Sequence, residues 1–187
     1  MVELYAGHWR AGVDLMWFKN FKDDAGKPAP WLFFSRHRAS VNYSNQPLWG
    51  STNAVSYNFK SGVGTVAVAA LGSNGFTSKL GVQYNKQHGN WLFFGWLVAD
   101  VRKRGGIDLF GLWRYQPALN ERWKALLQVE LFPVYQPAAR WWNLTQRLRL
   151  GAKYRSWSGG WMVDLNQTGS KHLAATSNIG AFMRHDF

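Results

Sequence analysis

The sequence predicts an all-β protein, an antiparallel up-and-down β-barrel formed by one domain over residues 1–187. Two observations carry this prediction. Apolar and polar residues alternate along most of the chain, which is the pattern of strands with two different faces. Short turns rich in Gly, Asn and Pro separate the alternating segments, and neither a Pro/Ser-rich linker nor a shift in composition divides the chain.

The alternation defines eleven candidate strands. It is clearest in residues 144–155, where Leu148 and Leu150 share one face and Arg147 and Arg149 share the other. Hairpin turns are expected at residues 72–75, 103–106 and 158–160, and the longest link at residues 20–30. The candidate strands are residues 3–18, 31–43, 51–60, 63–71, 76–86, 91–103, 107–116, 122–135, 142–157, 161–167 and 177–187.

The composition is basic and aromatic. Lys and Arg number 22 against 10 Asp and Glu, a formal net charge of +12, which favours anionic partners. The chain holds 12 Trp, 12 Phe and 7 Tyr but no Cys, so disulfides and thiolate metal sites are excluded.

Alternation alone does not say which face looks inward. A soluble barrel buries its apolar face, whereas a transmembrane barrel turns that face to lipid and encloses the polar one. The apolar run of residues 91–99 is too short for a membrane helix of about 20 residues but long enough for a tilted strand of about 9–11. Aromatic residues gather at strand ends, where membrane interfaces favour them. The predicted interface aromatics are Trp17, Tyr84, Trp91, Tyr115, Trp123, Tyr154, Trp157 and Trp161.

The last residues, 181–187, resemble the C-terminal β-signal of Gram-negative outer-membrane β-barrel proteins. Phe187 matches the terminal aromatic of that signal, whereas His185 replaces the more usual apolar or aromatic residue. The resemblance implies insertion by the barrel-assembly machinery into the bacterial outer membrane. Residues 1–5 lack a basic stretch followed by an apolar core, so we expect a mature chain without a signal peptide.

A bacterial membrane barrel normally has an even number of strands, so that both ends of the chain emerge on one side. We therefore expect ten to twelve strands, with twelve favoured. Either residues 3–18 contain two short strands, or one strand is divided wrongly, or one is missing.

A transmembrane barrel places most charges in its lumen. A basic lumen predicts a small channel that passes anionic solutes such as acidic sugars, since rings of Arg and Lys select anions. The chain resembles small monomeric porins in its size, expected strand count and charge, although no sequence motif is shared. The predicted lumen cations are Arg10, Arg36, Arg38, Lys79, Arg102, Arg114, Lys124, Arg147, Arg149, Lys153, Arg155 and Arg184, and the lumen acids are Asp14, Asp100, Asp108, Glu130 and Asp164.

Other functions stay open. Arg–acid networks also plug small barrels, and such a barrel serves as a structural component, an adhesin or a subunit of an envelope complex. Outer-leaflet lipid enzymes use a Ser/His pair, but His37 and Ser40 lie three residues apart and so on opposite strand faces. A soluble anion-binding barrel is less favoured. The His spacing predicts no metal site, and we expect no cofactor and no nucleic-acid partner.

Overall fold

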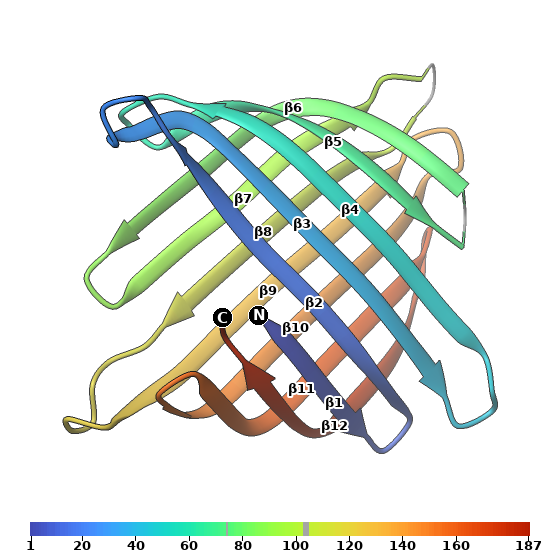
Figure 1. The fold of residues 1–187 in the computed structure, drawn as a ribbon. Helices are drawn as coiled ribbons and strands as arrows, with labels where there is room; N and C mark the ends of the chain where they lie inside the picture. The colour runs from blue at the N-terminus through green and yellow to red at the C-terminus, as the bar shows by residue number, and fades with distance from the viewer. Residues whose placement is uncertain (74, 103–104) are drawn as a thin grey trace.

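The computed structural model describes residues 1–73, 75–102 and 105–187 and shows a closed antiparallel barrel of twelve strands (Figure 1). Each strand pairs with its neighbours in the chain, and β1 pairs with β12 to close the sheet. The all-β prediction and the favoured count of twelve are confirmed. The strands are β1 (Val2–Gly7), β2 (Arg10–Lys22), β3 (Pro28–Asn42), β4 (Pro47–Asn58), β5 (Val63–Gly72), β6 (Gly75–His88), β7 (Trp91–Asp100), β8 (Ile107–Tyr115), β9 (Trp123–Gln136), β10 (Trp141–Tyr154), β11 (Trp157–Gly169) and β12 (Leu173–His185).

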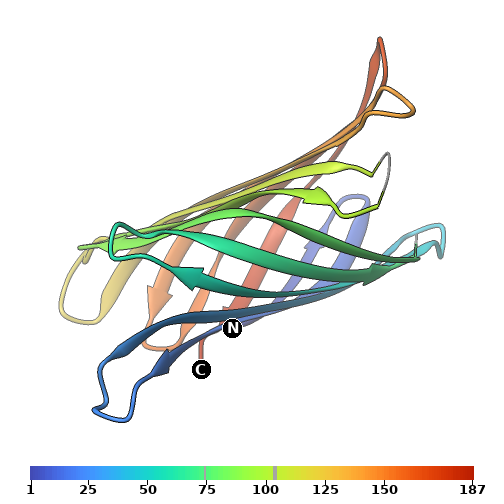
Figure 2. The ribbon, with the colours of Figure 1, turned by 90° about the horizontal axis from the view of Figure 1, so that it is seen from above.

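The even strand count brings both chain termini to one end of the barrel, which we call the terminal end. The turns at residues 23–27, 59–62, 89–90, 116–122 and 155–156 lie there. The opposite end carries the turns at residues 8–9, 43–46, 137–140 and 170–172, with the β5–β6 and β7–β8 connections. Residue 74 and residues 103–104, which belong to two predicted turns, lie outside the described residues. The strands run obliquely around the barrel (Figures 1 and 2).

The predicted strand 3–18 is wrong as a single element, and it contains the missing twelfth strand. The chain turns at His8 and Trp9, so β1 and β2 form a hairpin in which Tyr5 pairs with Gly12. Because of this turn, Tyr5 lies inside the barrel although Trp17, twelve residues later, lies outside. A glycine at position 12 makes room for this ring, because an added Cβ would lie 2.5 Å from the Tyr5 hydroxyl.

The predicted turn at residues 158–160 is also wrong, because the chain reverses three residues earlier. Tyr154 pairs directly with Trp157, and Arg155 adopts a left-handed backbone conformation with φ of 54°. Ser158 and Gly160 belong to β11, where a side chain on Gly160 would lie 2.2 Å from the Leu150 carbonyl oxygen. This glycine permits close approach of neighbouring strands rather than a turn.

The two faces of the sheet carry opposite kinds of residues. On β10, Leu148 and Leu150 are 38% and 54% exposed on the outer face, whereas Arg149 is 3% exposed inside. The six acidic residues of the described strands all occupy inward positions; they are Glu3, Asp14, Asp100, Asp108, Glu130 and Asp164. Apolar side chains therefore cover the outside of the barrel, and the strand carboxylates are enclosed.

Candidate functional site in the barrel lumen

A continuous network of charged side chains crosses the lumen at mid-height, and we call it the charged belt. Five arginines and four carboxylates contribute to it from seven strands, β1–β3 and β9–β12. The inward positions of these strands alternate with apolar outward ones, which is why the charges meet inside. The members are Glu3, Asp14, Arg36, Arg38, Glu130, Arg147, Arg149, Asp164 and Arg184.

Arg36 lies at the centre of one half of the belt. Its Nη2 is 2.5 Å from the Asp14 carboxylate and 2.9 Å from the Glu130 carboxylate. Arg38 donates to Asp14 at 2.7 Å, and Arg147 approaches Asp14 at 3.7 Å. Asp14 therefore neutralises three guanidinium groups in part, and none of the three has a carboxylate to itself.

The other half of the belt spans the seam where the barrel closes. Glu3 on β1 accepts from Arg149 Nε at 2.9 Å and from Arg184 Nη2 at 2.5 Å. Arg149 also donates to Asp164 at 2.6 Å, and Arg184 donates to the Gln128 side-chain oxygen at 2.9 Å. These side chains fix β1 against β10 and β12 inside the lumen.

Aromatic side chains fill the lumen beside the belt. Phe34 packs against Phe94 and Trp96 with ring centroids 5.3 and 5.2 Å apart, and Phe110 lies 4.9 Å from Trp96. The Arg36 guanidinium lies 5.8 Å from the Phe110 ring, so the charged belt contacts these aromatic side chains directly. The predicted wet, polar lumen is therefore incorrect at mid-height, where packed rings and ion pairs occupy the interior.

The lumen is less polar than expected because some strands carry apolar residues on both faces. Alternation does not show which of these residues point inward. Phe94, Trp96 and Val98 belong to the run of residues 91–99, in which both faces of β7 are apolar. A strand that is apolar on both faces is typical of a strand with no face turned to water.

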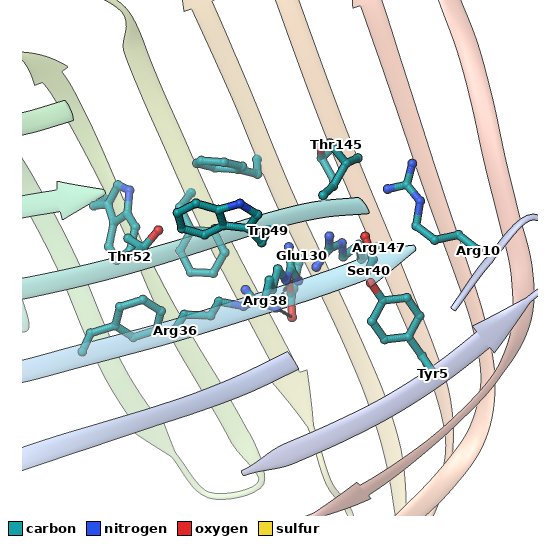
Figure 3. Close-up of a pocket in the computed structure, with 16 residues that line it drawn as sticks. Tyr5, Arg10, Arg36, Arg38, Ser40, Trp49, Thr52, Glu130, Thr145 and Arg147 are labelled. Atoms are coloured by element: carbon teal, nitrogen blue, oxygen red, sulfur yellow. Dashed lines mark hydrogen bonds and ion pairs between the residues drawn. The ribbon is translucent and has the colours of Figure 1, made fainter. Parts of the chain in front are cut away.

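A cationic cavity opens above the belt toward the opposite end, and we call it the vestibule. Its volume is about 300 Å³, and Figure 3 shows Arg10, Arg38 and Arg147 around it together with Glu130. Arg10 stacks on Trp9 at 4.6 Å and forms no ion pair with any described residue. The Arg147 Nε is buried without a hydrogen-bond partner in the described chain. Hydroxyl groups from Tyr5, Ser40, Thr52 and Thr145 complete the lining.

A smaller cationic cavity lies at the terminal end. Arg114 and Lys124 line it, and Arg114 donates to Gln128 at 2.7 Å without reaching a described carboxylate. Lys153 pairs with Asp186 close by. Burial alone would raise the pKa of Asp186, but the hydrogen bond and charge of Lys153 outweigh it and hold that pKa below its usual value.

The structure brings most of the predicted lumen residues to the interior. Ten predicted cations occupy inward strand positions; they are Arg10, Arg36, Arg38, Lys79, Arg114, Lys124, Arg147, Arg149, Lys153 and Arg184. Lys79 pairs with Asp108 at 2.6 Å, apart from the belt, and Asp100 ends β7. Arg102 and Arg155 are corrections, because both lie in turns rather than on the strand walls. The prediction missed Glu3, which lies in the first strand, β1.

The eight predicted interface aromatics all occupy outward positions. Several stack across neighbouring strands near the terminal end, such as Trp91 with Tyr115 at 4.2 Å and Trp123 with Tyr154 at 5.0 Å. Trp17, Tyr84, Trp157 and Trp161 are between 41% and 70% exposed. A second group of outward aromatics lies at the opposite end and was not predicted; it includes Phe76, Tyr135 and Trp142.

Phe187 follows β12 and is exposed at the terminal end. His37 and Ser40 lie on opposite faces of β3, as the spacing predicted, with His37 outside and Ser40 lining the vestibule. In the described residues, no group of three or more His, Asp or Glu side chains is placed to hold a metal ion. The described chain also contains no helix long and apolar enough to cross a membrane.

Comparison with known proteins adds little detail. No protein-family model matches the sequence, and no curated protein matches it significantly. Among solved structures, the chain is similar to the β domain of the Bordetella autotransporter BrkA. The TM-score is 0.43 and the sequence identity 9%, over 100% of this chain and 98% of that one.

Proposed function

We propose that the chain is a bacterial outer-membrane β-barrel whose lumen is closed at mid-height and whose vestibule binds anionic solutes. The exterior supports membrane embedding, because large apolar side chains cover it and aromatic residues gather toward both barrel ends. The described outward positions carry few charges, and two of them, Lys19 and Lys86, lie near the terminal end, where their ammonium groups reach a headgroup region.

One observation carries the binding function: three arginines surround the vestibule with little carboxylate to neutralise them. Arg38 and Arg147 share Asp14 with Arg36. Their second carboxylates are more distant, Glu130 at 3.6 Å from Arg38 and Asp164 at 3.9 Å from Arg147, and Arg10 has no ionic partner among the described residues. Guanidinium groups suit carboxylate, sulfate and phosphate groups because they offer paired donors. Acidic sugars are a fitting class, since the hydroxyl-bearing residues of the lining complement sugar hydroxyls.

The first test measures membrane embedding and binding separately. The chain should require detergent to remain dispersed and should migrate differently on gels before and after heating. Titration calorimetry with oligogalacturonate should show binding that weakens at least tenfold in Arg147→Gln and falls with added salt. The matched control is Arg155→Gln, in a turn at the other end of the barrel. Equal affinity in both variants would contradict the assignment of the vestibule.

An anion-selective channel is the second candidate, and the excess of inward cations over inward acids favours it. It requires a continuous aqueous path, whereas Leu112, Leu126 and Met162 are fully buried at mid-height. Planar-bilayer recordings separate the two candidates. We expect no steady conductance from the closed barrel. A conductance with anion selectivity would establish the channel instead.

A further inference from the structure

A polar cluster interrupts the apolar outer face of the barrel on β3 and β4, and we call it the exterior Ser–His cluster. It contains Ser35, His37, Ser51 and Asn53, all at outward positions. Ser35 Oγ lies 3.0 Å from His37 Nε2 and donates to Asn53 Oδ1 at 2.8 Å. Asn53 Nδ2 donates to Ser51 Oγ at 3.4 Å. The Ser–His spacing of two residues places both side chains on one strand face.

This cluster lies where polar groups are unfavourable. Ser35 is the middle residue of β3, and its cross-strand neighbour Trp17 and the nearby Val55 are exposed apolar side chains. Polar side chains at such depth in a membrane are costly and usually mark a functional position. His37 is exposed, and its Nδ1 has no hydrogen-bond partner in the described part of the chain. The hydrogen bonds within the cluster therefore leave the His37 ring facing the lipid with its Nδ1 unpaired in the described residues.

We propose that Ser35 and His37 form a nucleophile–base pair that cleaves the fatty-acyl esters of membrane lipids. The proposal rests on the membrane embedding proposed above and is independent of the vestibule. A hydroxyl within 3.0 Å of an imidazole nitrogen has the geometry that general-base activation needs. Only a lipid presents an ester carbonyl to a pair on this face of the barrel.

The reaction proceeds in two balanced steps. Ser35 Oγ attacks the ester carbonyl carbon while His37 Nε2 takes the hydroxyl proton. The alcohol leaves with that proton, and the acyl group remains on Ser35. Water, deprotonated by His37, then attacks the acyl-serine, which releases the fatty acid and restores the hydroxyl.

Two structural features make this reaction slow. Ser35 is 2% exposed, so neighbouring side chains must move before an ester reaches its oxygen. The single hydroxyl proton points to Asn53 in this arrangement, and the Asn53 amide must turn over before the hydroxyl donates to His37. A covalent probe, which needs one reaction per molecule, is therefore a better test than steady turnover.

The experiment treats the full-length folded barrel, in detergent micelles, with a long-chain alkyl fluorophosphonate. We expect time-dependent labelling, with peptide mass mapping placing the adduct on Ser35. Labelling should fall at least tenfold in Ser35→Ala and in His37→Ala, and should be unchanged in Ser170→Ala, whose hydroxyl lies in the exposed turn between β11 and β12. Released fatty acid from phospholipid micelles should follow the same order among the variants.

The heat-modifiable gel band shows in each sample whether the barrel is folded. A folded wild-type barrel that takes no label, or takes it at a residue other than Ser35, overturns the inference and leaves membrane embedding intact. A wild-type chain that stays dispersed without detergent contradicts the embedding instead. Mapping of the wild-type adduct needs no variant, so a variant that fails to fold does not weaken the test.

Discussion

Replacing Glu3 by Gln should destabilise the barrel more than any change at an exposed charge. Glu3 accepts three hydrogen bonds, one from Arg149 and two from Arg184, at 2.5 to 3.0 Å. Arg149 keeps Asp164 at 2.6 Å in the variant, but Arg184 loses the carboxylate it pairs with and keeps only the neutral Gln128 oxygen. The variant therefore leaves one guanidinium, on a residue 1% exposed, without an anion.

Removing one partner of a buried ion pair costs about 3–5 kcal/mol. Exposure requires no large discount here, because both side chains of the pair are almost fully enclosed. With a urea dependence of about 2 kcal/mol per molar, the unfolding midpoint should fall by about 1.5–2.5 M. Tryptophan fluorescence of the barrel in detergent micelles follows the unfolding, and the heat-modifiable gel band gives an independent reading.

The matched control is Asp186→Asn, which breaks the Lys153 pair at the rim, where both side chains are partly exposed. Exposed pairs contribute about 0–1 kcal/mol, so its midpoint should shift little. Equal, small shifts in Glu3→Gln and Asp186→Asn would refute the reasoning, because they would mean that water reaches the belt and screens it.

Two further predictions concern the same barrel. Lowering the pH should remove the contribution of Asp186: its folded pKa is depressed, so the stabilisation is present above the unfolded pKa of about 3.9 and disappears as pH falls through the folded value. The midpoint difference between wild type and Asp186→Asn should therefore be constant from pH 7 to 5, shrink as the pH falls below the unfolded pKa of about 3.9, and vanish once the pH is below the depressed folded pKa. Phe34→Ala should cost about 3–5 kcal/mol, measured by the same urea titration, because the ring is buried among Phe94, Trp96 and Phe110. A cost below 1 kcal/mol would indicate that the lumen is hydrated rather than packed.

The alternation of residues was enough to predict most of the strands and the facing of most of their residues. Leu148 and Leu150 are apolar whereas Arg147 and Arg149 are charged, so the sequence distinguishes the two faces of β10 clearly. Because successive residues of a strand point to opposite faces, the three-residue spacing also placed His37 and Ser40 on opposite faces of β3. These features are local, and a strand fixes them without reference to the rest of the fold.

The contents of the lumen were harder to predict because they depend on which strands face each other across it. Glu3, Arg149 and Arg184 meet only because β1 pairs with β12 and the sheet closes. No pattern within one strand contains that information. The turn between β1 and β2 was missed for a different reason: His8 and Trp9 are not typical turn residues, so the chain reversed without a compositional signal.

The exterior Ser–His cluster, in contrast, was within reach of the sequence. Ser35 and His37 are two residues apart on a predicted strand, and the rule that separated His37 from Ser40 also unites His37 with Ser35. The partner Asn53 was not accessible in this way, because its position opposite Ser35 depends on the register between β3 and β4.

The charged belt also specifies which face of a strand turns inward. β12 carries apolar residues on both faces near its end, with Phe182 inside and Met183 outside, so Arg184 and its partner Glu3 distinguish the two faces there. Replacing both by apolar residues of similar size, as Glu3→Leu with Arg184→Met, should leave the folded barrel as stable as wild type or stabilise it by about 1–4 kcal/mol. The same change should lower the folded fraction recovered on dilution from urea, because a slip of one residue then exposes no charge to lipid. If the double variant refolds as completely as wild type, the Glu3–Arg184 pair does not determine which face of β12 turns inward. The other strands then determine it.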